Sequence, residues 1–394
     1  MKQTILCLFF LTLLTGCWSN QELDGTAFVN SVGFEKSKES DKHIQISYDI
    51  IKPSVGSNGD DQSLGSGEKE HIVVEEDTET LLKGSHEIIK YTQRIPNFSH
   101  TKIWIISEKL AMEGSFDILD PIQRSQMLRL SSHAFITKDS PAKILNTPTL
   151  YDLPVTSEFS SSLDQTKYLT EYAPITLREF YKLLKGPTSN AYLPMIYIDD
   201  INNKEITAIG GTAVIKEDRM VGELNKTETT GLNLLLNQVK NGSIQVNLDE
   251  KEKASLEIHK LNTKTIPKMT GNQLEATIHV KVEGILADNM TSKELNNKFL
   301  DELEATFAEE AKRIIRSTLN KLQKELQTDI TNIGHETYRK YPKQWKKFSS
   351  EWNDIFANAD ITIEVDTTVL HQGFINEGTR RNRSPLTNPY FFGK

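Results

Sequence analysis

The sequence SKELNNKFLDELEATFAEEAKRIIRSTLNKLQKELQTDITN (residues 292–332) carries the clearest structural signal in the chain. Apolar side chains recur every three or four residues along it, as on one face of an α-helix, at Leu295, Phe299, Leu303, Phe307, Ala311, Ile315, Leu319, Leu322, Leu326 and Ile330. Thr291 and Glu294 match a capping box, and Gly334 matches a helix stop. The stretch therefore predicts one helix over 292–332, about 60 Å long.

This apolar stripe has two explanations. Most helices gain their stability by burying such a face against the rest of the protein. A partner helix in a coiled coil is the alternative, but the spacing of the apolar residues averages closer to four than to 3.5, which disfavours a regular heptad. We expect a helix packed across a sheet.

The segments on either side of this helix supply strands for such a sheet. Residues 243–248, 255–259 and 276–282 alternate apolar and polar side chains, which predicts an antiparallel meander. Residues 361–369 predict a closing strand, and Pro342 can begin a short helix. The bulky side chains Trp345, Phe348, Trp352 and Ile355 follow at helical spacing and are expected in the core.

Upstream, short strands and helices intermix without a clean βαβ rhythm, which favours an α+β fold. Helices are expected over 78–91, 116–130 and 227–240, and a further one begins at a Thr176–Glu179 capping box and ends at Gly186-Pro187. We expect three domains, each with a largely antiparallel or mixed sheet flanked by helices. Their predicted ranges are 17–145, 146–240 and 241–373, preceded by a signal peptide over 1–16 and followed by a mobile basic tail over 374–394.

The start of the chain predicts export. An apolar run from Ile5 to Leu14 is too short to span a membrane and is typical of a secretory signal. It ends in Leu14-Thr15-Gly16-Cys17, which resembles the lipobox of bacterial lipoproteins. That resemblance implies that Cys17 becomes the N-terminus and carries S-diacylglycerol and N-palmitoyl groups. A chance cysteine in an ordinary secreted protein is the alternative.

Composition narrows the function classes. Without residues 1–16 the chain carries 45 Lys and Arg (46 less Lys2) against 54 Asp and Glu, a net charge of −9. This disfavours a nucleic-acid partner and binding to anionic lipid through surface charge. Because Cys7 leaves with the signal peptide, Cys17 is the only cysteine left, so neither an intrachain disulfide nor a cysteine metal site is expected.

No familiar constellation of catalytic residues is found in the sequence. P-loop, dinucleotide-binding, His-Glu-x-x-His and Gly-x-Ser-x-Gly motifs are missing. The acidic clusters at 75–77 and 199–200 are interpreted as solvated turns, and His100 and His259 lack partners at metal-ligand spacing. We expect no enzyme, cofactor or metal, although a Ser/His/Asp triad assembled in three dimensions stays open.

Several stretches together resemble the Ger(x)C family, the lipoprotein C subunits of spore nutrient germinant receptors. The resemblance covers nearly all of residues 14–373 through segments whose order and spacing are specific: Gly16 to Leu23, Ser99 to Lys102, Ser107 to Ala111, Gly211 to Lys216, Met220 to Leu224, Glu228 to Leu232 and Tyr341 to Trp345. The chain departs from the family pattern at Ser125-Gln126 after Arg124, where an acidic residue is usual, and in its tail beyond Gly373.

The resemblance implies a non-catalytic binding or assembly subunit that is required for spore germination. It further implies three α+β domains, a complex with two integral membrane subunits, contact with other receptor complexes, and a place on the outer face of the cell or spore inner membrane. The alternative is an extracytoplasmic solute-binding lipoprotein of a transporter, a class that normally has two α/β lobes. A cell-surface hydrolase comes third, because it needs a catalytic constellation that the sequence does not display.

Overall fold

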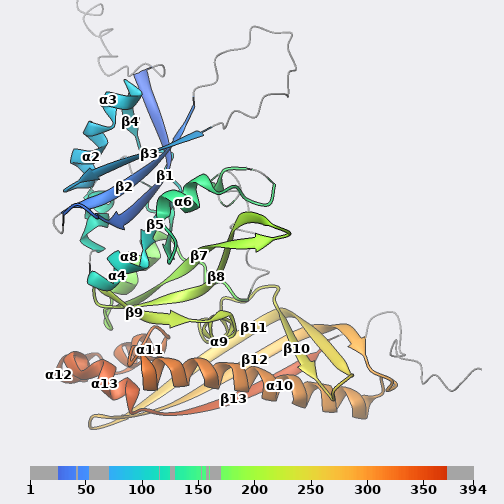
Figure 1. The fold of residues 1–394 in the computed structure, drawn as a ribbon. Helices are drawn as coiled ribbons and strands as arrows, with labels where there is room; N and C mark the ends of the chain where they lie inside the picture. Colours follow the sequence, from blue (N-terminus) through green and yellow to red (C-terminus); the bar gives the residue numbers. More distant parts are fainter. Residues whose placement is uncertain are drawn as a thin grey trace, which may run out of the picture.

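The computed structural model describes residues 25–40, 43–52, 71–114, 116–124, 129–151, 153–156, 159 and 170–370. Within these residues the chain forms a sheet of nine strands and a sheet of four, both with helices packed on them (Figure 1). This confirms the predicted α+β class. The expected signal peptide, Cys17 and the basic tail over 374–394 lie outside the described residues.

The nine-stranded sheet is mixed. Its order is β3-β2-β1-β5-β6-β7-β8-β9, and β4 pairs with β1. The central pairs β1–β5, β5–β6 and β6–β7 are parallel, whereas the pairs toward both edges are antiparallel. The strands are β1 (Thr26–Lys36), β2 (Ile44–Ile51), β3 (His71–Thr78), β4 (Ile95–Asn97), β5 (Ile103–Ser107), β6 (His133–Thr137), β7 (Asn190–Ile201), β8 (Lys204–Lys216) and β9 (Arg219–Leu224).

The expected N-terminal and middle units share this one sheet. They meet where β6 lies parallel to β7, with Ile136 opposite Met195. Both faces of the sheet are covered, because Trp104 and Ile106 belong to one apolar core while Ile103 and Ile105 belong to another. The predicted boundary near residue 146 thus falls between strands of a single sheet, and the division into domains stays a prediction.

The helices around this sheet are short: α2 (Leu81–Glu87), α3 (Ile89–Thr92), α4 (Glu108–Glu113), a 3₁₀ turn (Phe116–Leu119), α5 (Asp120–Arg124), α6 (Pro141–Asn146), α8 (Leu177–Leu184) and α9 (Lys226–Leu235). The helix expected from residue 78 begins later, because the Thr80 hydroxyl caps it by accepting from the Lys83 amide at 3.2 Å. Of the helix expected over 116–130, the described residues form the 3₁₀ turn and α5, with Pro121 in the first turn of α5, and residues 125–128 lie outside the described part.

The four-stranded sheet has the order β10-β11-β12-β13. The strands β10 (Ser243–Asn247), β11 (Lys253–Thr270) and β12 (Gln273–Met290) form the predicted antiparallel meander, and β13 (Asp360–Val369) joins β12 in parallel. The helix α10 (Asn297–Asn320) lies along this sheet (Figure 1). Its predicted stripe is buried, with Leu303, Phe307 and Ala311 fully so, which confirms a helix packed on a sheet.

The bounds of this helix differ from the prediction. Asn296, rather than Thr291, is the N-cap, and its side chain accepts from the Phe299 amide at 3.0 Å. After Asn320 the backbone continues as a π-helical turn (Lys321–Glu325) and then breaks at Gln327, whose φ is +47°. Gly334 does not stop the helix, because it lies in the first turn of a separate helix, α11 (Ile333–Lys340).

Four short helical segments complete the C-terminal unit: α11 (Ile333–Lys340), α12 (Pro342–Phe348), a 3₁₀ turn (Ser349–Glu351) and α13 (Trp352–Ala357). Pro342 is the first residue of α12, as expected. Trp345, Phe348 and Trp352 are buried together, with the two indole rings 4.8 Å apart. Among the described residues, no helix has both the length and the apolar character needed to cross a bilayer.

Candidate functional site: the junction between the two sheets

The helix α9 lies where the two sheets meet (Figure 1). Its first turn is fixed by a capping box between Asn225 and Glu228. One face of α9 binds the nine-stranded unit through two hydrogen bonds. Thr229 donates to the Thr212 hydroxyl in β8 at 3.1 Å, and Asn233 donates to the Tyr172 carbonyl, in the segment before α8, at 2.7 Å. The helix is shorter than the expected 227–240, because Asn237 takes a left-handed conformation just beyond it.

The opposite face of α9 contacts the long helix α10. Gly231 lies so close to it that an added Cβ would stand 2.1 Å from the Thr318 hydroxyl oxygen and 2.8 Å from the Ile314 carbonyl oxygen. Thr318 also donates to the Glu228 carbonyl at 2.8 Å. An added side chain would clash at this approach, so α9 contacts α10 through its own backbone while its side chains bind toward the nine-stranded sheet.

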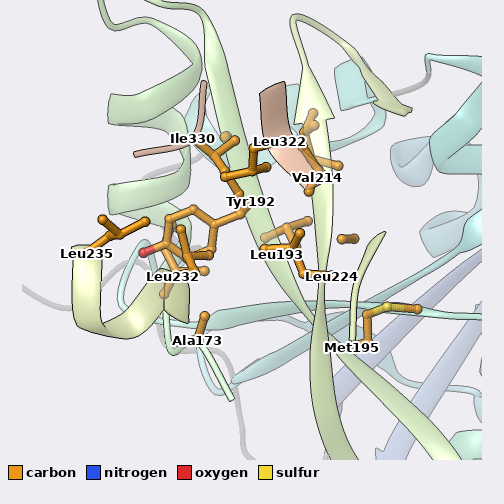
Figure 2. Close-up of a cluster of buried hydrophobic side chains, with 14 of the residues drawn as sticks. Ala173, Tyr192, Leu193, Met195, Val214, Leu224, Leu232, Leu235, Leu322 and Ile330 are labelled. Atoms are coloured by element: carbon orange, nitrogen blue, oxygen red, sulfur yellow. The ribbon is translucent and has the colours of Figure 1, made fainter. Parts of the chain in front are cut away.

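The segments singled out as family-like between Gly211 and Leu232 therefore have a structural role. They form the second half of β8, most of the strand β9 and the middle of α9. Apolar side chains from both units meet around them in one continuous core: Tyr192, Leu193, Val214, Leu224, Leu232, Leu235, Leu322 and Ile330 (Figure 2). The family-like segments between Gly211 and Leu232 therefore form part of the connection between the two sheets.

A second connection centres on the buried carboxylate of Asp329, which is 0% exposed. It accepts four hydrogen bonds, from the Thr331 amide (2.9 Å) and hydroxyl (2.7 Å), the Gly334 amide (2.8 Å) and the Trp352 indole (2.9 Å). Burial raises the pKa of this carboxyl, and the hydrogen bonds act in the opposite direction. This network fixes the chain where the long helix ends.

The nine-stranded sheet reaches into this network through Asn190, the first residue of β7. Its side-chain amide donates to the Asp329 carbonyl at 3.1 Å and to the Asn353 side chain at 2.7 Å. Thr188 lies just before it, against Gly334, where an added Cβ would stand 2.3 Å from the Thr188 methyl group. The two units are thus joined at α9 and again at the start of β7.

The structure brings together one buried set of Ser, Thr, Asp and His side chains, but not in catalytic order. Asp49 binds the His71 ring at 2.5 Å and accepts from Thr156 at 3.1 Å, while Ser31 binds Thr156. In a Ser/His/Asp triad the histidine stands between the acid and the nucleophile. Here the carboxylate lies between the histidine and the hydroxyl groups, which is not the catalytic order. Through Thr156, the hydrogen bonds to Asp49 in β2 and Ser31 in β1 attach residues 153–156 to the sheet.

The other residues considered for chemistry are dispersed. The cluster at 75–77 lies in strand β3, so its interpretation as a turn was wrong. Each of its carboxylates has a separate partner, Gln45 for Glu75, Lys90 for Glu76 and His43 for Asp77. Among the described residues, no group of three or more His, Cys, Asp or Glu side chains could hold a metal ion.

His100 packs edge-on against Phe28, and His259 lies 4.0 Å from Glu257. Asp199 and Asp200 lie at the end of β7, where Asp200 accepts from the Asn203 amide at 2.9 Å in the turn to β8. The candidate lipid-bearing residue, Cys17, lies outside the described residues, so lipidation stays a prediction.

Sequence reasoning missed the residues of the junction. Gly231 carried a usable signal, because glycine inside a helical pattern costs stability and often marks a close contact. Asn190 and Asp329 carried none, since each lies in a segment that reads as an ordinary strand or helix.

Two family models match the chain in succession: "Spore germination protein N-terminal domain" over residues 19–198, and "Spore germination B3/ GerAC like, C-terminal" over residues 210–373. The second begins within β8, so it contains the α9 junction and the whole four-stranded unit.

Curated relatives are similar along their whole length. "Spore germination protein YndF" of Bacillus subtilis is 25% identical over 395 residues, covering 94% of this chain and 96% of the relative. "Spore germination protein KC" of the same organism is 26% identical over 399 residues, with the same coverage of both chains, 94% and 96%. The crystal structure of the GerBC protein has a TM-score of 0.54 at 18% identity and covers 90% of this chain and 100% of its own, a likeness of fold.

Proposed function

This chain belongs to the family of spore germination proteins that the two matching models describe, the Ger(x)C family, and we propose that it serves as the lipid-anchored C subunit of a nutrient germinant receptor. The observation that carries the proposal is that both models fit one chain in order, over 19–198 and 210–373. The role is one of binding and assembly with two integral membrane subunits, without catalysis.

The anchor in this proposal is Cys17. Thr26, the first residue of β1, follows Cys17 by nine positions, so at no more than about 3.6 Å per residue the lipid-bearing residue lies at most about 32 Å from the start of β1. That end of β1 pairs with β4, far from the four-stranded sheet (Figure 1). The nine-stranded unit would then lie nearest the bilayer, on the outer face of the cell or spore inner membrane.

Germination of spores lacking the protein tests the receptor role. Each nutrient is supplied separately, with a non-nutrient trigger as control. We expect the response to one nutrient class to fail, the non-nutrient trigger to work, and a lipidatable copy to restore the response. If all nutrients still work after related receptors are also removed, the receptor role is wrong and a solute-binding lipoprotein becomes the better reading.

Cell fractionation tests the anchor separately. Cys17→Ala should release the protein from the membrane fraction, because two acyl chains are what make such anchoring stable. Cys7→Ala is the matched control, since that residue leaves with the predicted signal peptide and should change nothing. A Cys17→Ala protein that stays fully in the membrane fraction would show that something other than lipid holds it there.

A further inference from the structure

The turn between α3 and β4 exposes two large apolar side chains. Tyr91 in α3 is 60% exposed, and Ile95, the first residue of β4, is 54% exposed. Residues 92–94 alone separate them in the chain, and the two elements contact each other. Ile88, just before α3, is fully buried, which is the usual place for a side chain of this kind. An apolar surface shared by neighbouring residues, unlike a single exposed side chain, indicates a contact site.

Hydrogen bonds hold the backbone of this turn in one conformation. Gln93 is left-handed, with a φ of +52°, and its amide donates to the Ile89 carbonyl at 2.8 Å. The Thr92 hydroxyl donates to the Arg94 carbonyl at 3.0 Å. The exposure of the two apolar side chains is therefore built into the folded turn.

The charged groups beside the turn suit the surface of a bilayer. Lys90 pairs with Glu76 at 2.9 Å, and its Nζ lies 4.8 Å from the centre of the Tyr91 ring. Arg94, between the two apolar residues, forms no ion pair within the part of the chain that the structure describes. In membrane proteins, aromatic rings gather at the level of the lipid headgroups, and Arg and Lys side chains extend to the same level.

This turn adjoins the end of β1 that leads to the proposed anchor. Ile95 lies opposite Thr26, the first residue of β1, in a parallel pair. Paired strands are about 4.8 Å apart, so Ile95 is beside the point where the chain from Cys17 enters the fold. Figure 1 shows α3 and β4 at this end of the nine-stranded sheet, with the four-stranded sheet at the opposite end of the molecule.

We propose that the α3–β4 turn contacts the lipid bilayer, with Tyr91 and Ile95 in the interfacial layer and Arg94 at the level of the phosphates. The inference rests on the anchor proposed at Cys17, whose tether of at most about 32 Å keeps this end of the fold near the membrane. Because the chain is acidic overall, the contact is made by apolar side chains and needs no anionic lipid. It determines which side of the nine-stranded unit faces the membrane.

Spin labelling of the lipidated mature chain on phosphatidylcholine vesicles tests this contact. Cys17 is the only cysteine after removal of the signal peptide and is occupied by lipid, so the cysteine introduced by Ile95→Cys is labelled alone. On vesicles this label should lose most of its collisions with a water-soluble nickel complex and gain collisions with oxygen, which concentrates in lipid. The control is Ile266→Cys in β11, where the natural side chain is 38% exposed, and its label should stay open to nickel.

A second substitution tests whether the apolar surface makes the contact. Tyr91→Asp, combined with the label at Ile95→Cys, places a charge in the interfacial layer and should restore nickel collisions while Cys17 keeps the chain on the vesicles. Met112→Asp in α4 also replaces an exposed apolar side chain and should leave the label shielded. If Tyr91→Asp does not fold, the two labels decide the result alone. Equal nickel access at the two labelled positions, or shielding that Tyr91→Asp leaves unchanged, would overturn the proposal.

The contact, the anchor and the receptor role fail in different ways. A chain that floats with the vesicles while the Ile95→Cys label stays open to nickel keeps its anchor and lacks the contact. A chain that does not float has no working anchor, which would overturn both. Germination of spores lacking the protein reports on the receptor role, whatever the label shows.

Discussion

The two sheets of this protein bury their strands in different ways. In β11 and β12 buried and exposed residues largely alternate, and α10 covers the apolar face. In the nine-stranded sheet all five residues of β5 are buried, because helices and loops cover both faces. The four-stranded sheet is therefore covered mainly by one long helix, with α11 and α13 contacting β11 and β12 beside it, whereas the nine-stranded sheet draws on many short elements.

The largest expected effect comes from breaking that one helix. Ala311 is fully buried in the interior of α10. Ala311→Pro removes a backbone hydrogen bond and introduces a clash, which should lower the free energy of unfolding by about 3 kcal/mol or more. Hydrogen exchange should rise in β10 to β13 and change little in β1 to β6.

The control for this experiment is Arg313→Ala, an exposed substitution in the same helix. It should leave both the melting temperature and the exchange pattern unchanged. An unchanged melting temperature for Ala311→Pro would contradict the dependence of the four-stranded unit on α10.

The next effect concerns the end of the helix. In Asp329→Asn an NH₂ group, which donates hydrogen bonds, replaces one carboxylate oxygen, which accepts them. If this NH₂ group takes the place of Oδ2, it faces two other donors, the Gly334 amide and the Trp352 indole, and neither can accept from it. We expect a loss of about 2 kcal/mol, within the range for a buried hydrogen-bonding group left unsatisfied. Urea unfolding measures it, with the exposed Asp288→Asn as matched control. Equal stability of the two variants would show that the Asp329 network does not hold the junction.

A smaller effect is expected where the units touch. Gly231→Ala adds one methyl group that would meet Thr318 and the Ile314 carbonyl. Overpacking costs 1–3 kcal/mol, and alanine recovers up to about 1 kcal/mol of helix propensity, so we expect a net loss of about 1 kcal/mol. Thermal unfolding checks this. Gly25→Ala, where an added Cβ meets nothing within 4 Å, is the control. A stabilised Gly231→Ala would mean that α9 and α10 can move apart freely.

The same comparison explains what the sequence could predict. Strands with one buried face and a helix with one apolar stripe leave periodic patterns, so the meander and the burial of α10 were predicted correctly. Strands that are buried on both faces leave continuous apolar runs in the sequence, and such a run does not indicate which other strand it pairs with. The parallel pairing of β1 with β5 brings Val32 beside Trp104, and no local pattern contains that contact.

Helix ends and the junction were harder to predict for a related reason. The pattern through Leu326 and Ile330 continues at helical spacing, yet the backbone breaks between them, because the chain turns to bury Asp329 among four donors. Those donors come from residues up to 23 positions away along the chain, such as Trp352. Periodicity reports which residues are buried, and it does not report which distant polar groups pair.

The smallest effects are expected from surface ion pairs, which should not distinguish the two sheets. Lys138 pairs with Glu223 at 2.7 Å across the nine-stranded sheet, and Lys260 pairs with Glu283 at 2.8 Å in the other. In both pairs the lysine is more than half exposed, so each alanine variant should change the free energy of unfolding by less than about 1 kcal/mol. The hydrogen bond to Glu223 raises the pKa of Lys138. The stabilisation of the folded state by this pair is therefore present at neutral pH, and it is lost only as the pH rises past the ordinary range for lysine. Urea unfolding of Lys138→Ala and Lys260→Ala at low and high salt measures both. A loss above 1 kcal/mol for only one of them would mean that charge, as well as core packing, separates the two regions.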